Sequence, residues 1–448
     1  MKKTILTAFA ALLVAVPAVQ AQKVNESALL SKIEKCDADI ADAKKNTKAA
    51  TWLNRAKAYY DAAVEPTKNL FAGMDAAMLK LAVGEPLSTG SAEANGVAYE
   101  TMEYPYFTAY VKDGKVMTWK QTKWVYADAV DKAVESYNKA YELDPKQAEK
   151  VKLGLRQIGD FCSQVGNTNL DLGEYATAAD AYIKAYEAQS TPACGDADPM
   201  LLYYAGYLRT IDGANDPRSY VLGAGYLADA LEKGYADEEG NIYYYLFHCY
   251  YGQKAADPSF VFKAKDALLA GIGKFPKNER ILDGLMQLYT TEEGVGDPAD
   301  LITLIDAAIA DNPENIDLWF GRGRIFYALK NYDESIASFA KIVELQPDFF
   351  DGNYYLGVFY TVKGDAMNKE MNEKQYTSQA AFDADLAAVN QVYLAAVPWF
   401  EKAYRLKPQD VDTLEFLKQL CFRLRDEEGM IDKYNTYNTL YKQAKGEL

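Results

Sequence analysis

The chain has 448 residues, a formal net charge of −16 at pH 7 and 49% hydrophobic residues, with 35 tyrosines. This apolar content excludes a disordered chain. The acidic balance, without a long run of Lys or Arg, argues against nucleic acid and acidic membrane surfaces as partners, since both attract positive charge.

The N-terminus has the pattern of an export signal. Lys2 and Lys3 precede an apolar run, Ile5 to Val16, which is followed by the tripeptide Val19-Gln20-Ala21 with small residues at the cleavage positions. The run is too short for a membrane-spanning helix, which needs about 20 residues. We therefore predict a signal peptide at residues 1–21 and a soluble product exported to the periplasm or the medium. No cysteine follows Ala21, so a lipid anchor is not expected.

A first pair of helices is predicted on either side of an insertion. The first helix carries Trp52, Ala56 and Tyr59, and the second carries Ala133, Tyr137, Ala140 and Pro145. The intervening insertion covers about residues 64–124. Within it, Tyr106 to Lys120 alternates aromatic and polar residues around Asp113-Gly114, a strong signal for a small β-hairpin.

Similar helix pairs recur along the middle of the chain. The recurring residues are Gly173, Tyr175, Ala178, Tyr182 and Ala185; then Tyr203, Gly206 and Tyr207 with Ala224, Ala228 and Leu231; then Tyr244, Phe247 and Tyr251 with Ala264, Leu268, Gly271 and Pro276; and then Leu282, Leu285 and Tyr289 with Leu301, Ile305, Ala308 and Pro313. Because aromatic, small and terminating residues keep the same order, one continuous repeat array is predicted.

The clearest pair begins at Trp319 and ends at Pro347. Its pattern residues are Trp319, Gly323, Phe326, Ser335, Phe339, Ile342 and Pro347. Small residues such as Gly323 and Ser335 allow two helix axes to approach closely. Pro347 ends the second helix, because it can neither donate its hydrogen bond nor continue the helical backbone.

The last units carry a second insertion and a terminal cap. Tyr354 to Tyr360 and Ala396 to Pro408 form a pair split by residues 365–393, which lack Gly and Pro and are expected to lengthen the two helices into a projecting hairpin. Leu414 to Tyr437 forms a degenerate last pair with a polar end, as in the cap of an open solenoid.

These spacings resemble the tetratricopeptide-repeat (TPR) family, whose unit is about 34 residues, over the whole mature chain in about eight units. The resemblance implies an all-α fold, a right-handed α-solenoid of antiparallel helix pairs, with the hairpin decorating the first repeat. It implies much less about function.

The residue inventory argues against catalysis, and we predict neither an enzyme nor a metal or cofactor. His248 is the only histidine and lies among tyrosines, which favours packing over metal binding or base catalysis. Gly321-Arg322-Gly323-Arg324 lacks the third glycine and the preceding strand of a phosphate loop. The acidic loops at 194–198 and 212–216 lack the oxygen spacing of an EF-hand.

The five cysteines include no Cys-x-x-Cys pair. In an exported protein at least one should be a buried free thiol, because the count is odd. A disulfide between Cys162 and Cys194, which would bracket one helical hairpin, is left open.

The TPR resemblance implies that certain positions of each first helix point into a concave groove. These are Tyr203, Tyr207, Tyr245, Asp283, Gln287, Phe320, Arg324, Tyr327 and Tyr354. Such an aromatic groove suits a peptide, an amphipathic helix or a sugar, whereas a phase error of one residue would instead place these side chains between repeats.

The leading hypothesis is therefore a protein-binding scaffold of the bacterial envelope with a protein or peptide partner. Two alternatives stay open: a glycan-binding protein, and an enzyme hidden in the first insertion. Self-association is also possible from the sequence.

Overall fold

The computed structural model describes residues 24–446, so the predicted signal peptide lies outside the described part. The chain divides into two units, which meet in the sequence between Tyr235 and Ala236 and are described separately. Among residues 24–446, no helix combines the length and the apolar character that a membrane crossing requires.

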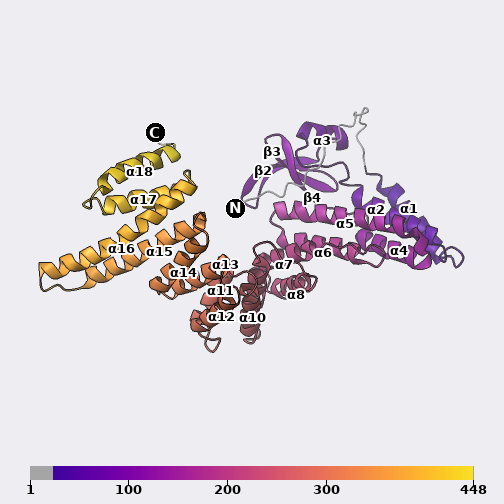
Figure 1. The fold of residues 1–448 in the computed structure, drawn as a ribbon. Coiled ribbons are helices and arrows are strands. Elements are labelled where there is room, and N and C mark those ends of the chain that lie inside the picture. Colours follow the sequence, from indigo (N-terminus) through magenta and orange to yellow (C-terminus); the bar gives the residue numbers. More distant parts are fainter. Residues whose placement is uncertain (1–23, 447–448) are drawn as a thin grey trace. The chain divides into compact units, whose positions relative to one another are not determined.

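Unit 1 contains eight helices of the α type and one antiparallel sheet (Figure 1). The bounds of the helices are α1 Glu26–Ala41, α2 Ala49–Val64, α3 Ala76–Val83, α4 Ala129–Leu143, α5 Ala148–Asp171, α6 Tyr175–Ser190, α7 Met200–Asp212 and α8 Arg218–Glu232, with a short 3-10 turn at Pro145–Gln147. The pairs are α2 with α4, α5 with α6, and α7 with α8, while α1 packs against α2.

The described residues of unit 2 form helices joined by turns, without a β-strand. Its helices are α9 Asn241–Tyr251, α10 Phe260–Ile272, α11 Glu279–Thr291, α12 Pro298–Asp311, α13 Ile316–Ala328, α14 Tyr332–Leu345, α15 Phe350–Glu373, α16 Gln379–Leu406, α17 Val411–Arg423 and α18 Met430–Ala444. They form five successive pairs. With the three pairs of unit 1, the described residues hold eight pairs, in line with the prediction of about eight units.

Short polar residues and prolines delimit these helices. The side chains of Asn278, Asn315 and Asn331 accept hydrogen bonds from backbone N–H groups at the starts of α11, α13 and α14, groups that have no partner inside the helix. Pro347 and Pro408 follow the ends of α14 and α16 within two residues. The local sequence therefore sets where these helices begin and end.

The insertion between α2 and α4 is larger in structure than the hairpin predicted from the sequence. The expected hairpin is present as β3 (Phe107–Lys112) and β4 (Lys115–Gln121), and positive φ angles at Asp113 and Gly114 make its turn. Two further strands, β1 (Ser88–Ala94) and β2 (Val97–Glu103), complete a sheet in the order β1-β2-β3-β4. The predicted hairpin is thus only half of a four-stranded sheet.

The sheet and α3 enclose their own small core beside the helical pairs. Leu79 of α3 packs with Phe107, Val111 and Val116 of the last two strands. Strand β4 also contacts α5, which Figure 1 shows running beside the sheet. The insertion is therefore a compact element with a defined position in unit 1.

The second insertion, predicted at residues 365–393, lies in the long helices α15 and α16 and the turn between them. The two helices pack against each other over Met371, Val389 and Tyr393, and the Tyr393 hydroxyl donates a hydrogen bond of 2.5 Å to Asp365. Residues 365–393 therefore continue a packed helix pair.

An arginine on the first helix of a pair links three helices, and we call this contact the arginine bridge. Arg55 of α2 donates to Asp37 of the preceding helix α1 (2.7 Å) and to Ser136 of the partner helix α4 (2.6 Å). Arg322 of α13 likewise donates to Asp306 of α12 (2.8 Å) and Ser338 of α14 (2.9 Å).

A third arginine bridge occurs at α7. Arg209 donates to Asp180 of α6 and to Ser219 of α8. Arg209 and Ser219 are buried, as are Arg55 and Ser136 of the first bridge. Hydrogen-bonding the guanidinium in this way offsets part of the cost of removing its charge from water.

Two of the bridges share a tryptophan three residues before the arginine. The indole N–H of Trp52 donates to the carbonyl of Asn46 (2.7 Å), and that of Trp319 donates to the carbonyl of Pro313 (2.8 Å). The donor and acceptor are six residues apart in both cases. The first helices α2 and α13 are thus built alike although most of the chain separates them.

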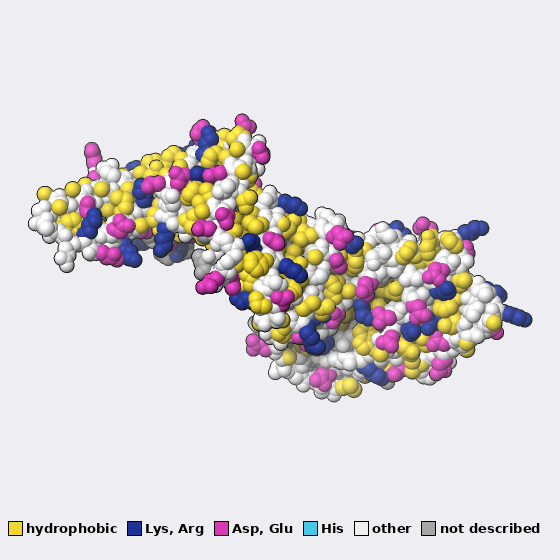
Figure 2. All heavy atoms as spheres, turned by 90° about the horizontal axis from the view of Figure 1, so that it is seen from below, with side chains coloured by type: hydrophobic (Ala, Val, Ile, Leu, Met, Phe, Trp, Pro, Cys, Tyr) yellow, Lys and Arg dark blue, Asp and Glu magenta, His cyan; other side chains and the backbone are white. Residues whose placement is uncertain are grey.

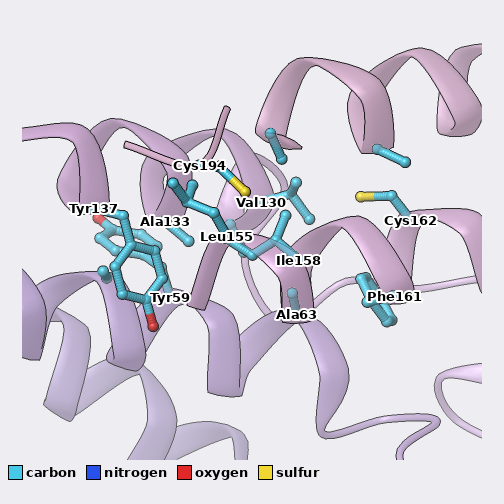
Figure 3. Packing of buried hydrophobic residues seen from close by; sticks show 14 of the residues in the cluster. Tyr59, Ala63, Val130, Ala133, Tyr137, Leu155, Ile158, Phe161, Cys162 and Cys194 are labelled. Atoms are coloured by element: carbon cyan, nitrogen blue, oxygen red, sulfur yellow. The ribbon is translucent and has the colours of Figure 1, made fainter. Parts of the chain in front are cut away.

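All five cysteines are free and buried, so the Cys162–Cys194 disulfide that the sequence left open is not formed. Figure 3 shows the two sulfur atoms apart in the core of unit 1, where Cys162 packs among Ile158, Phe161 and neighbouring alanines. Burial raises the pKa of Cys162 to about 12 and that of Cys421 to about 11.

We expect thiol reagents to label the native protein slowly at neutral and mildly alkaline pH. A thiol with a raised pKa remains protonated until the pH nears that value, and only the thiolate reacts. The measurement is the rate of colour release from a disulfide reagent, with the urea-unfolded chain as the control in which all five thiols react at once. Rapid labelling of the folded chain would contradict this burial.

Candidate partner-binding surface

The first helices of successive pairs in unit 2 meet one another on one side. Helix α11 contacts both α9 and α13. At the start of α11, a carboxylate oxygen of Glu279 lies 3.6 Å from a guanidinium nitrogen of Arg324 on α13, and the same oxygen accepts a hydrogen bond of 3.3 Å from the Tyr355 hydroxyl on α15. Three first helices therefore converge on one side chain.

The next residue extends this set toward α9. Arg280 donates a hydrogen bond of 3.0 Å to the hydroxyl of Tyr245, and its guanidinium lies 5.9 Å from the ring centre of Tyr244. We name the set Tyr245, Glu279, Arg280, Arg324 and Tyr355 the inner row. It contains both charge signs and two phenol groups, all on the first helices of four pairs.

A lysine just before α11 adds a second link to α15. The Lys277 ammonium nitrogen lies 3.8 Å from a carboxylate oxygen of Asp351. It also lies 5.2 Å from the ring centre of Phe320 and 5.1 Å from that of Phe349, within the range of a cation–π contact. The N-terminal ends of α11 and α15 are thus held on the same side as the inner row.

The inner row is partly exposed, so its polar groups can exchange partners. Side-chain exposure is 45% for Glu279 and 19% for Arg324. Burial, with a further contribution from the charge of Glu279, raises the pKa of Tyr355 and keeps its hydroxyl protonated as a donor. Such a surface can form hydrogen bonds and ring contacts with a polypeptide.

Five of the predicted groove residues have side chains that remain accessible in unit 2. Tyr245 and Arg324 belong to the inner row, Asp283 and Gln287 are exposed on α11, and Tyr327 is 37% exposed with its ring 5.9 Å from the Arg324 guanidinium. The predicted positions on these helices therefore include surface positions.

Phe320 is a correction to the predicted groove. It is only 3% exposed and packs its ring 5.0 Å from Phe339 and 5.2 Å from Tyr355 in the core between repeats. Phe320 contacts the partner helix α14 through Phe339, whose ring fills the space beside Gly323. Phe320 is therefore not available to a ligand.

Tyr354 is partly buried and makes several ring contacts. Its ring lies 5.7 Å from Phe350, 5.8 Å from Phe400 of α16 and 6.0 Å from Phe416 of α17. Burial raises the pKa of Tyr354 to about 12. The neighbouring Tyr355, which belongs to the inner row, is partly buried as well, so the assignment of Tyr354 to a groove stays a prediction.

The other two predicted residues, Tyr203 and Tyr207, are on α7 in unit 1 and are partly buried. The Tyr203 ring lies 5.4 Å from those of Tyr204 and Tyr235. Tyr203 and Tyr207 therefore belong to unit 1, whereas the inner row belongs to unit 2.

Sequence reasoning missed Glu279, Arg280 and Tyr355. Glu279 and Arg280 open α11 directly after its cap Asn278, and the predicted groove took only Asp283 and Gln287 from this helix. Tyr355 is one position after the chosen Tyr354, and one residue turns a helix by about 100°.

His248 and the acidic loops are engaged in contacts of their own. The His248 imidazole packs 4.4 Å from the Tyr244 ring, and burial lowers its pKa. Asp196 pairs with Lys152 at 3.3 Å and with Arg156, and Asp216 pairs with Arg218 at 2.8 Å. Figure 2 shows acidic, basic and apolar side chains interspersed on one face of the molecule.

Comparison with known proteins identifies a repeat in unit 2. Residues 292–349, which include α12, α13 and α14, match the family model described as tetratricopeptide repeat. This match supports a tetratricopeptide repeat over residues 292–349. No curated protein matches the chain.

Several solved structures show a similar succession of helices at low identity. A TPR repeats protein from Bacteroides fragilis is 17% identical, with a TM-score of 0.26, 58% of this chain and 97% of that chain covered. The C-terminal part of a TPR repeat-containing protein from Cytophaga hutchinsonii is 16% identical, with a TM-score of 0.33 and coverage of 64% and 94%. Yeast Tom70 is 14% identical, with a TM-score of 0.35 and coverage of 94% and 86%.

Proposed function

We propose that the protein is a non-catalytic scaffold of the bacterial envelope that binds a partner peptide or helix on the first helices of its repeats. The observation that supports this most is the convergence of α11, α13 and α15 on Glu279. It brings charged and phenolic side chains from separate repeats onto one surface, where a single polypeptide segment could contact several of them together.

The chemistry of the inner row favours a partner with both apolar and polar side chains. Tyr245 and Tyr355 offer ring faces and hydroxyls, while Arg280 and Arg324 offer multiple N–H donors. Aromatic and arginine side chains are the types that most often dominate binding energy at protein interfaces.

The test is capture of partners from envelope extracts on three forms of the tagged protein. The first is the native sequence, the second carries Tyr245→Ala and Arg324→Ala in the inner row, and the third carries Phe262→Ala and Leu304→Ala, two exposed side chains on the second helices α10 and α12. Loss of about 2 kcal/mol at the inner row would weaken binding roughly thirtyfold.

We expect the inner-row variant to lose its partner and the second-helix variant to keep it, with the same circular dichroism for all three. Equal capture by both variants would place recognition elsewhere. If no protein is retained by any form while a glycan array gives a signal that the inner-row variant loses, the glycan-binding alternative replaces the scaffold proposal.

A further inference from the structure

The two edges of the sheet in unit 1 differ in what lies beside them. At the β4 edge, the chain before α3 pairs with the strand. The N–H of Gly73 donates a hydrogen bond of 2.7 Å to the carbonyl of Val116, and the N–H of Val116 donates one of 2.8 Å to the carbonyl of Met74. Asp75 forms a further bridge with Lys115. The chain itself therefore satisfies outward backbone groups of this edge strand.

The β1 edge is open in the described part of the chain. Strand β1 pairs with β2 from Ser88 to Ala94 without a shift of register, and no backbone hydrogen bond joins these residues to any other described segment. Each of them is exposed or half-buried. The strand contains neither lysine nor proline, which commonly protect sheet edges from pairing. Strand β1 thus offers unpaired backbone groups to an added strand.

The turn between β1 and β2 determines which groups point outward. Asn95-Gly96, with φ angles of 51° and 72°, forms a two-residue turn, so the flanking pair Ala94 and Val97 is of the hydrogen-bonded kind. The two kinds of pair alternate along an antiparallel ladder. The residues whose N–H and C=O groups point away from β2 are therefore Thr89, Ser91 and Glu93. The same rule holds at β4, where Val116 is the first residue beyond the closing pair.

The sheet is held in place against the helices of unit 1. The Tyr175 hydroxyl, at the start of α6, donates a hydrogen bond of 3.3 Å to the side chain of Asn95 in the β1–β2 turn. Lys120 of β4 pairs with Glu174 at 2.5 Å. A strand that is fixed before binding loses less conformational freedom when a partner pairs with it.

The glutamates beside the open edge set its charge. Residues 85–103 contain four glutamates and no lysine or arginine. Glu93 and Glu100 are both exposed, and neither forms an ion pair within the described residues. They share a face of the sheet, because Glu100 lies opposite Ser91, two positions from Glu93 on β1. An added strand would place alternate side chains on this face, next to Glu93.

This charge distinguishes between partners. Pairing of β1 with β1 of a second copy would bring two acidic segments together without a lysine or arginine in either, which is unfavourable. A segment with lysine or arginine at alternate positions instead places opposite charge beside Glu93 and Glu100.

We propose that β1 binds an extended, basic peptide segment of a partner protein, which adds to the sheet as a fifth strand. This site belongs to unit 1 and does not depend on the inner row of unit 2.

The experiment is fluorescence anisotropy with three labelled seven-residue peptides and the purified chain without residues 1–21. The basic peptide alternates lysine with threonine, the acidic peptide has glutamate in place of lysine, and the methylated peptide is the basic one with every backbone nitrogen methylated. The methylated peptide keeps the positive charge, so it measures attraction to the acidic chain as a whole. We expect the basic peptide to bind about tenfold more tightly than either of the others, which lose the charge contacts or the backbone hydrogen bonds.

Two pairs of variants connect the binding to β1. Ser91→Pro removes one outward N–H at an edge, where proline is tolerated, and should weaken binding of the basic peptide about tenfold, whereas Ser91→Ala keeps the N–H and should not. The double variant Glu93→Gln, Glu100→Gln should reduce the preference for the basic over the acidic peptide. The double variant Glu238→Gln, Glu314→Gln removes the same charge from exposed positions of unit 2 and should keep that preference.

The proposal is overturned if the methylated or the acidic peptide binds as tightly as the basic one, if none binds at millimolar concentration, or if Ser91→Pro binds like Ser91→Ala. A doubled mass in light scattering that Ser91→Pro abolishes would put a second copy at the edge and would also overturn it. The comparison of the three peptides uses the unaltered chain, so it remains decisive even where a variant folds poorly.

Discussion

Replacing Phe339 with alanine is expected to lower the free energy of unfolding by about 3–5 kcal/mol, the range for a large aromatic side chain lost from a packed core. Phe339 is completely buried in α14, and its ring lies 5.0 Å from Phe320 and 4.9 Å from Phe359. It occupies the space beside Gly323, where an added Cβ would come within 2.5 Å of the Phe339 ring.

The measurement is the shift of the urea-unfolding midpoint followed by circular dichroism. Phe262→Ala is the matched control, because Phe262 is 49% exposed on α10 and its loss should change the free energy by less than about 1 kcal/mol. A Phe339→Ala variant as stable as this control would mean that the interior between α13, α14 and α15 is packed differently.

Removing Asp37 from the first arginine bridge is expected to cost about 2–3 kcal/mol, because Arg55 would keep its charge in a buried site without the carboxylate that pairs with it. Arg55 is 5% exposed, and Asp37 also accepts a hydrogen bond of 2.7 Å from Tyr59. The effect should fall below that of a fully enclosed pair, since the Asp37 side chain is 39% exposed and Glu135 lies 4.0 Å from the guanidinium.

A second substitution separates the unpaired charge from the lost contacts. The double variant Asp37→Ala, Arg55→Met should recover part of the stability, because an apolar side chain in this position needs no acceptor. Asp39→Ala is the control on the same helix, since its pair with Lys45 is exposed and should contribute less than about 1 kcal/mol. If Arg55→Met gives no recovery, the charge of Arg55 is not what makes Asp37 important.

The helix pairs were predictable because their signals are local. Gly323, Phe339 and Pro347 each act within one helix pair, through close approach, space filling and helix termination. The arginine bridges were not predictable in this way. Their acceptors, such as Asp37 and Ser136 for Arg55, are 18 and 81 positions away and become neighbours only through packing.

The sheet and the surface show two other limits. Asn95-Gly96 has the same positive φ angles as Asp113-Gly114, but β1 reads Ser-Thr-Gly-Ser-Ala-Glu-Ala and lacks the apolar alternation by which a strand is recognised. On α15, the choice between Tyr354 and Tyr355 depended on one residue of phase. Each residue along a helix turns the side-chain direction by about 100°, and the repeat pattern of this chain is too irregular to fix the position of a groove residue to within one residue.

The arginine bridges also determine where the chain can be cut into fragments. Each one takes its aspartate from the helix before the pair, so a fragment starting at α2, α7 or α13 would keep the arginine and lose its aspartate acceptor. Helix α1, which supplies Asp37 to the first bridge, is in this respect an integral part of the first repeat. A stable N-terminal fragment should therefore begin upstream of Asp37, and a break in unit 2 is better tolerated before α11 than between α12 and α13.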